Sequence, residues 1–316
     1  MFYEEEGLVI KSTGSFYLVR TVDARIIECK LRGKFRMQGI KTTNPITVGD
    51  IVSFEQDSRQ NCGIITNIKE RKNYIYRKSI NLSKISHIIA ANIDCAFLIV
   101  SMVEPNTPLG FIDRFLVAAE SFRIKTILIF NKTDLYNTKI QEKCLNLQRL
   151  YSNIGYECIS TSIVTGQGID MLRQRMQNQV SLFGGQSGVG KSSIINVLEP
   201  SLQLKIGDIS DYNNKGKHTT TFAEMFELSF GGFIIDTPGI KEFGLIQYKK
   251  EEISHYFPEM LRLLSECRFN NCVHTHEPHC AIKQALEKGL ISQTRYQNYL
   301  SIIQNEDIDL KDWMLE

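Results

Sequence analysis

The chain has 316 residues, of which 42% are hydrophobic and 23% are charged, and its formal net charge is +2. This length allows two or three domains with separate cores, and the near-neutral charge excludes a protein that binds polyanions through bulk charge alone. No apolar run approaches the roughly 18 residues of a membrane span, and the acidic residues 4–6 are unlike a secretory signal, so we expect a cytoplasmic protein with its scattered cysteines reduced.

Residues 1–68 have the pattern of a small β domain. Short runs rich in β-branched and aromatic residues occur at 8–10, 16–19, 25–29 and 51–54, separated by turn residues such as Gly14. This pattern predicts a small barrel or sandwich of short strands. An OB-type barrel is one such fold, and it commonly binds nucleic acid.

A basic strip runs through residues 25–41. It combines Phe35 and a single acid, Glu28, with six basic residues: Arg25, Lys30, Arg32, Lys34, Arg36 and Lys41. Such a strip suits a phosphate backbone with a base stacked on the aromatic ring, but a solvated hairpin face would have the same composition. From the strip alone, both interpretations stay open. Residues 69–87 follow as a basic surface connector with little apolar periodicity, and residues 69–84 are a second candidate for an RNA contact.

From residue 93 the pattern alternates between strands and helices. Continuous apolar runs at 93–100 and 126–130 predict strands buried on both faces, and 109–122 and 138–152 have helical spacing. A short strand near 158–159, a helix ending near 179 and a strand at 180–183 follow. This order predicts a parallel sheet with right-handed crossovers.

The second buried strand ends at Asn131, Lys132, Thr133 and Asp134, which fit N-K-x-D. Ligands of open α/β sheets bind at the carboxyl ends of the strands. An aspartate accepts from both N1–H and the exocyclic amine of guanine, Asn131 would serve the opposite edge, and the Lys132 stem would lie on the ring. Alone, the motif would read as a helix-capping surface turn; beside a phosphate loop it predicts a guanine site.

That phosphate loop comes at residues 185–192, between the strand at 180–183 and a predicted helix at 192–198. It fits G-x-x-x-x-G-K-[ST], and its residues are Gly185, Gln186, Ser187, Gly188, Val189, Gly190, Lys191 and Ser192. Glycines let backbone N–H groups surround phosphate oxygens at a helix N-terminus. Lys191 would reach the β and γ phosphates, and Ser192 would ligate magnesium.

Two more nucleotide motifs follow the phosphate loop. Residues 215–221 are polar and contain glycine, as a switch loop should, and a threonine there would complete the magnesium shell: we expect Thr220, or else Thr219. Runs at 225–229 and 232–235 predict two adjacent strands, and the second ends in the D-x-x-G motif of Asp236 and Gly239. The carboxylate would hold magnesium through water, and the glycine amide would meet the γ-phosphate.

The C-terminal region is predicted to be helical over 251–266 and 281–304. The expected core positions in these helices are Leu261, Leu263, Leu264, Ala285, Leu286, Tyr299 and Leu300. Between these helices lie Cys267, Cys272 and Cys280 with His274, His276 and His279. Three thiols and an imidazole at this spacing predict a closed structural zinc site, and the spacing alone leaves the histidine ligand open. The last dozen residues are acidic, which makes an RNA contact there doubtful.

The order of the motifs is cyclically rotated relative to translation-factor-like GTPases, because N-K-x-D precedes the phosphate loop instead of following D-x-x-G. With the G-Q-S-G-V-G-K-S-S run at 185–193, K-H-T-T-T at 217–221 and the Cys/His cluster, the chain resembles the RsgA (YjeQ/YloQ) family. The resemblance implies an OB-fold RNA-binding domain (1–68), a circularly permuted GTPase domain (69–248) and a helical zinc domain (249–316). It also implies GTP contacts by Ser160, Thr161 and Ser193, and His274 as the zinc ligand.

The resemblance also implies what the protein does. Family members are GTPases of small-subunit assembly, so the expected partners are the 30S subunit and its 16S rRNA, with Mg²⁺ and Zn²⁺ as cofactors and a monomeric chain in the cytoplasm. Ile240 follows D-x-x-G where many GTPases have a water-orienting glutamine. In this family a switch-loop histidine, here His218, is implicated instead. The competing class is a nucleotide-gated protein-interaction switch without an RNA partner.

Overall fold

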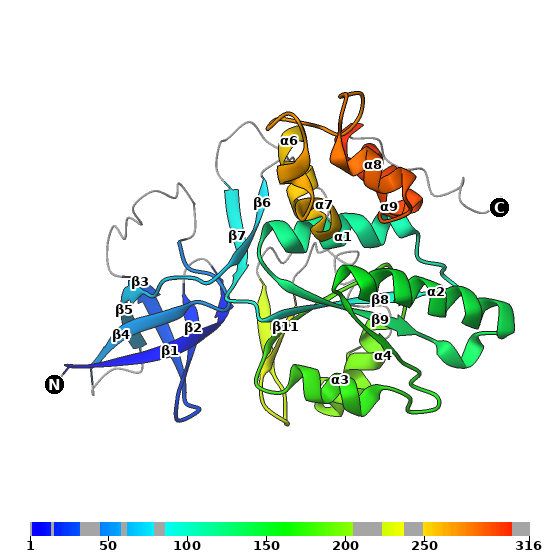
Figure 1. The fold of residues 1–316 in the computed structure, drawn as a ribbon. Coiled ribbons are helices and arrows are strands. Elements are labelled where there is room, and N and C mark those ends of the chain that lie inside the picture. Colours follow the sequence, from blue (N-terminus) through cyan, green and yellow to red (C-terminus); the bar gives the residue numbers. More distant parts are fainter. Residues whose placement is uncertain are drawn as a thin grey trace, which may run out of the picture. The chain divides into compact units, whose positions relative to one another are not determined.

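The computed structural model describes residues 2–13, 16–31, 45–57, 62–78, 86–204, 223–236 and 249–304 (Figure 1). The chain forms two compact units. Unit 1 consists of residues 1–96, 170–183 and 192–240, and unit 2 of residues 97–169, 184–191 and 241–316. Each unit contains a hydrophobic core of its own.

Unit 1 begins with a closed five-stranded barrel, the blue and light-blue strands of Figure 1. Its strands are β1 (Phe2–Ser12), β2 (Tyr17–Thr21), β3 (Ile26–Leu31), β4 (Ile51–Asp57) and β5 (Cys62–Ile68). They pair in the order β1-β2-β3-β5-β4, and β4 returns to β1, which closes the barrel. Only β3 and β5 run parallel among these pairs. The predicted OB-type barrel is confirmed.

The alternation of side chains fills the barrel interior. Along β2, Tyr17, Val19 and Thr21 are buried while the residues between them are half-buried. Phe54 and Ile65 complete the same core from β4 and β5. Burying each such apolar side chain contributes about 1.5–3 kcal/mol, so the pattern of period two is enough to fix which face points inward.

The basic connector contains more structure than the sequence predicts. β6 (Tyr74–Lys78) and β7 (Ser86–Ala91) form an antiparallel two-stranded ribbon. Ile75 and Ala90 are register partners, and both are buried. Ala91 at the end of β7 is buried as well, and these few apolar residues give no periodic signal, which is why the sequence predicts only a connector here.

The remainder of unit 1 contains α3 (Ile169–Met176), β11 (Val180–Gly184), α4 (Lys191–Leu198), η2 (Pro200–Leu202), β12 (Glu224–Glu227) and β13 (Phe233–Asp236). β11 and β13 are parallel, whereas β12 is antiparallel to β13. A tight turn at Gly231 and Gly232 joins β12 to β13, and both glycines have positive φ. The predicted strands at 225–229 and 232–235 match this hairpin within two residues.

Unit 2 contains the strands β8 (Cys95–Ser101), β9 (Lys125–Asn131) and β10 (Glu157–Ser160), which lie side by side in the order β10-β9-β8. All seven residues of β8 are buried, as its continuous apolar run predicts. The helices α1 (Leu109–Ser121) and α2 (Thr138–Ile154) connect these strands, with η1 (Thr133–Leu135) after β9. Asn137 caps α2 by accepting a hydrogen bond from the N–H of Ile140.

The C-terminal part of unit 2 is more broken than predicted. Instead of two long helices it has α6 (Lys250–Ile253), η4 (Ser254–Tyr256), α7 (Pro258–Leu261), η5 (Leu264–Glu266), α8 (Ala281–Glu287) and α9 (Gln293–Gln304). Pro258 forces the preceding residue into an extended conformation and starts α7, and Gly289 at φ +68° lies between α8 and α9.

All but one of the predicted core positions of this region pack into its core. Ala285 and Tyr299 are buried, and Leu263, Leu264, Leu286 and Leu300 pack partly against the same core. Leu261 is 51% exposed, so its prediction as a core residue is wrong. The break at Pro258 shortens the helix and changes the face on which Leu261 would have lain. The described part of the chain contains no helix with the length and hydrophobicity of a transmembrane segment.

Candidate nucleotide site and metal centre

The predicted phosphate loop joins β11 to α4, in the strand–loop–helix arrangement that the motif requires. Ser187 and Gly188 are exposed at its tip, whereas Lys191 and Ser192 are buried where α4 begins. The Lys191 ammonium donates to the carbonyl oxygens of Gly185 and Gln186, at 2.9 and 2.6 Å. The loop therefore curls around its own lysine. Ser193 follows in the first turn of α4 and is half-buried.

Gly190 shows why this loop needs glycine. Its φ is +101°, in the region that side chains disfavour, and a Cβ built there would lie 2.4 Å from Nδ2 of Asn131. Gly185 is similar, with a φ of +141° and only 2.7 Å between a built Cβ and the carbonyl oxygen of Ile99. The phosphate loop thus packs directly on the N-K-x-D segment and on β8.

Asn131 connects three motifs that are far apart in the sequence. It is 1% exposed at the end of β9. Its Nδ2 donates to the carbonyl oxygen of Val189 in the phosphate loop at 2.9 Å, and its Oδ1 accepts from Thr161 Oγ1 at 3.0 Å. The sequence places Asn131 at an edge of guanine, whereas in the structure both ends of its amide hold neighbouring loops.

The carboxylate of Asp134 is exposed and can accept hydrogen bonds from a ligand. Ser162 Oγ donates to its carboxylate at 2.5 Å, which fixes the orientation of the side chain. Thr133 donates to the carbonyl oxygen of Thr161 from both N–H and Oγ1, so the two loops are joined twice more. The hydroxyl of Ser160 accepts from Gln148 on α2 instead. Sequence reasoning therefore missed Ser162, although it belongs with Ser160 and Thr161 to one turn, the Ser-Thr-Ser turn at 160–162.

A second element that the sequence did not indicate is the segment 101–107, between β8 and α1. Lys132 Nζ donates to the carbonyl oxygen of Glu104 at 2.5 Å. Tyr136 accepts from the N–H of Met102 at 3.1 Å and donates to the carbonyl oxygen of Asn131 at 2.7 Å. On the other side, a Cβ built at Gly188 would lie 3.3 Å from Pro105. The segment is thus in contact with both nucleotide motifs.

The predicted magnesium residues are only partly described. Ser192 lies in the first turn of α4, and Asp236 ends β13, whose residue Ile235 pairs with Leu182 of β11. The carboxyl ends of these two parallel strands therefore lie at the same edge of the sheet. His218, Thr219, Thr220 and Gly239 lie outside the described residues.

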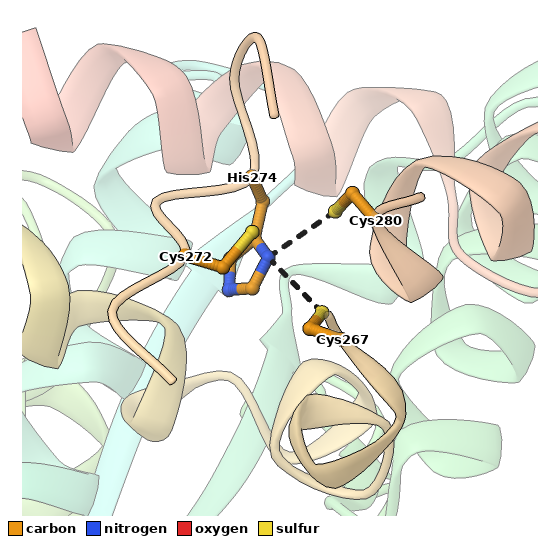
Figure 2. Close-up of side chains that lie close together, drawn as sticks. All are labelled: Cys267, Cys272, His274 and Cys280. Carbon is orange, nitrogen blue, oxygen red and sulfur yellow. Dashed lines mark hydrogen bonds between the residues drawn. The ribbon is translucent and has the colours of Figure 1, made fainter. Parts of the chain in front are cut away.

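The cysteine and histidine cluster is brought together by the fold (Figure 2). Ligand atoms of Cys267, Cys272, His274 and Cys280 all lie within 4.8 Å of one another. His274 Nδ1 is 3.3 Å from Cys280 Sγ and 3.7 Å from Cys267 Sγ. By contrast, the other two histidines of the segment, at 276 and 279, are exposed. The imidazole that faces the thiols is therefore that of His274.

A rigid frame holds this cluster. Glu277 accepts from the backbone N–H groups of Val273 and Thr275 at 2.8 and 2.9 Å. From α9, the Tyr296 hydroxyl donates to the carbonyl oxygen of His274 at 2.6 Å, and Tyr299 donates to that of Val273 at 2.8 Å. Both neighbours of the imidazole are thus anchored, and the ring itself lies in the C-terminal core.

The protonation of the cluster fits a cation site. Burial raises the pKa of Cys272 to about 12 and also raises the pKa of the Cys280 thiol. Burial lowers the pKa of His274, which favours its neutral form. Thiols this buried need a compensating positive charge to ionise, and three thiols with one neutral imidazole form the donor set of a structural Zn²⁺. The residues present therefore fit zinc.

Two family descriptions match the sequence. The one named RsgA GTPase covers residues 68–246, and the one named RsgA N-terminal domain covers residues 6–65. The chain belongs to the RsgA GTPase family. A Flavobacterium psychrophilum protein named small ribosomal subunit biogenesis GTPase RsgA is 52% identical over 95% of this chain and 93% of its own length. A Flavobacterium johnsoniae protein of the same name is 53% identical over the same shares.

Solved structures of the RsgA family have the same fold. The crystal structure of YjeQ from Thermotoga maritima matches with a TM-score of 0.78 at 34% identity, over 96% of this chain and 98% of that one. The structure of YloQ, described as a circularly permuted GTPase, matches with a TM-score of 0.75 at 29% identity, over 96% and 95%. The permuted order inferred from the motifs is therefore confirmed.

The basic strip of this RsgA family member is described only at Arg25 and Lys30. Arg25 donates to Asp23 at 2.6 Å and to Glu5 at 2.8 Å, so two carboxylates offset its charge. The hydrogen bond from Arg25 is also the main reason why the pKa of Asp23 falls to about 2. Lys30 is exposed on β3. The other candidates, Arg32, Lys34, Phe35 and Arg36, lie outside the described residues.

Proposed function

We propose that this GTPase acts late in the maturation of the small ribosomal subunit, binding the 30S particle in the GTP state and leaving it after hydrolysis. The observation that carries the nucleotide part is the convergence on Asn131, which bonds the phosphate loop and the Ser-Thr-Ser turn at once. The ribosomal part is supported by relatives at about 50% identity that are named small ribosomal subunit biogenesis GTPase RsgA.

Guanine selection falls to Asp134. Its carboxylate is exposed and oriented by Ser162, so it can accept from N1–H and the exocyclic amine of the base. Adenine has no such pair of donors at this edge. The stem of Lys132, held by Glu104, would lie against the face of the ring. Asn131 and Thr161 keep these groups in place, so we assign them to positioning rather than to direct recognition.

The triphosphate would be held by the phosphate loop. Backbone N–H groups of 185–191 and the Lys191 ammonium would bind the β and γ phosphates, exchanging the carbonyl partners of the lysine for phosphate oxygens. Ser192, Asp236 and a switch threonine, Thr220 or Thr219, would hold magnesium, with Gly239 at the γ-phosphate. When bound, magnesium neutralises charge that develops on the phosphate oxygens.

For the catalytic group we propose His218. Ile240 carries no group that could orient water, so a neutral imidazole in the preceding loop is the candidate to orient the attacking water or accept its proton. A His218→Ala variant should bind GTP normally and lose most hydrolysis stimulated by 30S subunits. Stimulated hydrolysis at the wild-type rate would show that His218 is not the catalytic residue.

We propose that the chain divides into three functional domains. They are an RNA-binding barrel at 1–68, the GTPase domain at 69–248 and a zinc domain at 249–316. One structural Zn²⁺ would bind Cys267, Cys272, His274 and Cys280. The exposed Lys30 and the remaining basic residues of 25–41 would contact 16S rRNA. The protein would work as a cytoplasmic monomer.

The deciding experiment is co-sedimentation with 30S subunits in a non-hydrolysable GTP analogue and in GDP, at several salt concentrations, together with GTP hydrolysis with and without 30S. We expect binding in the analogue that weakens steeply with salt, and faster hydrolysis with 30S. Nucleotide-independent or absent binding would overturn the ribosomal role and favour a protein-interaction switch.

A further inference from the structure

The amino-terminal barrel is hydrogen-bonded to the strand hairpin that leads to the D-x-x-G motif. Within unit 1, β12 pairs with β13 on one side and with β1 of the barrel on the other. Lys11 is the register partner of Glu224, and Glu224 is the register partner of Asp236. A barrel residue is therefore two strands away from the aspartate that we assign to magnesium.

β1 can form this pairing because its partner β4 does not extend along its full length. β4 pairs with β1 over Phe2 to Leu8, and the backbone of Val9 bonds to that of Gly49 and Asp50. Beyond this point the edge is open, while the opposite edge stays paired with β2 as far as Ser12. Unpaired strand edges readily accept another strand, and here β12 occupies the edge. A register shift between Val9 and Lys11 marks where β1 changes partner.

Two ion pairs hold the junction. Lys11 Nζ lies 3.0 Å from both carboxylate oxygens of Glu224. Arg20 on β2 donates to both oxygens of Glu227, from Nε at 2.7 Å and from Nη2 at 2.5 Å. The Arg20 guanidinium also lies 5.6 Å from the ring centre of Phe233 on β13. Both cations belong to the barrel, both carboxylates belong to β12, and Arg20 contacts both strands of the hairpin.

These pairs contribute only modestly to folding stability, and the Lys11–Glu224 pair contributes the least. The side chains are 40% exposed at Lys11, 39% at Glu224, 22% at Arg20 and 50% at Glu227. Ion pairs this accessible to water contribute little to the free energy of folding. The bidentate Arg20–Glu227 pair does, however, restrict the orientation of the strands that carry it, and the Lys11 ammonium limits the distance between β1 and Glu224. The junction is thus better suited to fixing relative position than to stabilising the fold.

We propose that Lys11 and Arg20 are positioning residues through which the barrel controls GTP hydrolysis. By holding Glu224 and Glu227 they set β12 against β13, and so the backbone at Asp236. A ligand that displaces the barrel would change the pairing of β12 with β13. The same pairing responds to the nucleotide end of the sheet, so the two sites are coupled through it. This inference rests on the proposed function, because it takes the barrel's ligand to be the small ribosomal subunit.

The test compares variants that remove or reverse one charge of the Lys11–Glu224 pair with a double variant that exchanges the two charges. Full-length wild type, Lys11→Glu, Glu224→Gln and the double variant Lys11→Glu/Glu224→Lys are assayed for GTP hydrolysis with and without saturating 30S, and for 30S co-sedimentation. Glu6→Gln is the matched control, because it breaks an exposed ion pair with Lys69 in the barrel that does not involve β12. Circular dichroism verifies that each variant is folded.

We expect the single variants to retain the unstimulated rate within about twofold and to lose about fivefold or more of the stimulation by 30S, since allosteric couplings commonly have this size. The loss should lie in the maximal stimulated rate, with 30S binding and the KM for GTP unchanged. The exchanged pair should recover stimulation to within about twofold of wild type, and Glu6→Gln should match wild type.

Full stimulation in both single variants would overturn the inference, as would an exchanged pair that fails to recover. If wild type itself is not stimulated by 30S, the proposed ribosomal function fails, and the coupling role of Lys11 and Arg20 fails with it. A loss in Glu6→Gln equal to that in Glu224→Gln would show a general effect of barrel charge, which also overturns the inference.

Discussion

Gly190 and Asn131 share a space that holds only one of their side chains. The amide of Asn131 fills the position where a Cβ of residue 190 would lie, and its Nδ2 bonds to the carbonyl oxygen of Val189 next to it. The conformation of the phosphate loop is therefore tied to the N-K-x-D motif. We therefore expect a change at either residue to disturb both the proposed phosphate contacts and the proposed guanine contacts.

Gly190→Ala should weaken GTP binding, because the added methyl group would displace Asn131 and the φ of +101° disfavours alanine. We expect about tenfold to hundredfold weaker binding of a fluorescent GTP analogue, since a steric clash in a close-packed site costs about 1–3 kcal/mol. Gly289→Ala is the control, because Gly289 also has a positive φ but nothing within 4 Å. Equal affinities in the two variants would contradict the steric explanation.

Glu199, at the end of α4, gives a pH-dependent contribution to stability. Its carboxylate accepts from Ser201 Oγ and from the N–H of Ser229, at 2.6 Å each. These hydrogen bonds lower the pKa of Glu199 from 4.5 to about 2, and the bond from Ser201 has the largest effect. A lowered folded-state pKa stabilises the protein above the unfolded value, and this stabilisation is lost as the pH falls from 4.5 towards 2.

Glu199→Gln should therefore lower the urea midpoint of unfolding at pH 7. The difference in urea midpoint between the variant and wild type should become smaller as the pH approaches 3. The exposed Glu142→Gln serves as the control for a general loss of one negative charge. A gap that stays constant with pH would show that the carboxylate of Glu199 makes no pH-dependent contribution.

Among the helices, a buried ion cluster joins α9 to α1 and α7. Arg295 donates to Asp113 at 2.6 Å and to both oxygens of Glu259 at 2.7 and 3.0 Å. Asn298 and Tyr151 donate to the same Asp113 carboxylate. Arg295 and Asp113 are both 1% exposed, so removing one partner would leave the others charged in a low-dielectric core.

Arg295→Met should destabilise the protein by about 3–5 kcal/mol, the usual cost of leaving a buried charge unpaired. Urea unfolding followed by circular dichroism measures this loss, with Arg262→Met as the control. Arg262 is an exposed arginine of the same C-terminal region, directly after α7, and it donates to the carbonyl oxygen of Ile154. Equal midpoints for the two variants would show that the cluster is not what fixes α9. The double variant Arg295→Met/Asp113→Asn should recover part of the loss, because fewer charges stay buried.

For the molecule as a whole, the C-terminal core depends on the cysteine cluster. Cys272 and Cys280 belong to the same core as Phe257, Met260 and Tyr299. The segments between the cysteines are short and polar, so few apolar contacts replace a lost cation. Zinc would thus act as part of this core.

Replacing His274, a proposed zinc ligand, should unfold the region after residue 249. We expect about one zinc ion per chain by elemental analysis, loss of zinc in His274→Ala, and faster proteolysis after residue 249 in that variant. The matched controls His276→Ala and His279→Ala should retain zinc, since both side chains are exposed. Zinc retained in His274→Ala but lost in either control would assign the ligand to a different histidine.

The features that could be predicted from the sequence are those encoded by neighbouring residues. The barrel, the strand–helix alternation and the phosphate-loop context follow from local periodicity and turn residues. The helix break at Pro258 is also local, but the apolar spacing across it hid the break and led to the wrong prediction for Leu261. The ribbon of β6 and β7 was missed because its buried apolar residues, such as Ile75 and Ala90, do not recur with a regular period.

The sequence by itself determined the motifs of this protein: a phosphate-loop motif, an N-K-x-D motif and a cysteine and histidine set that could hold a metal, in an order that indicates circular permutation. Only the tertiary structure decided how they meet. It turned Asn131 inward to join three loops, selected His274 from three nearby histidines and placed β12 on the free edge of β1. Motif chemistry depends on residues a few positions apart, whereas these contacts depend on strand order and core packing, which bring together residues as distant as Lys11 and Glu224.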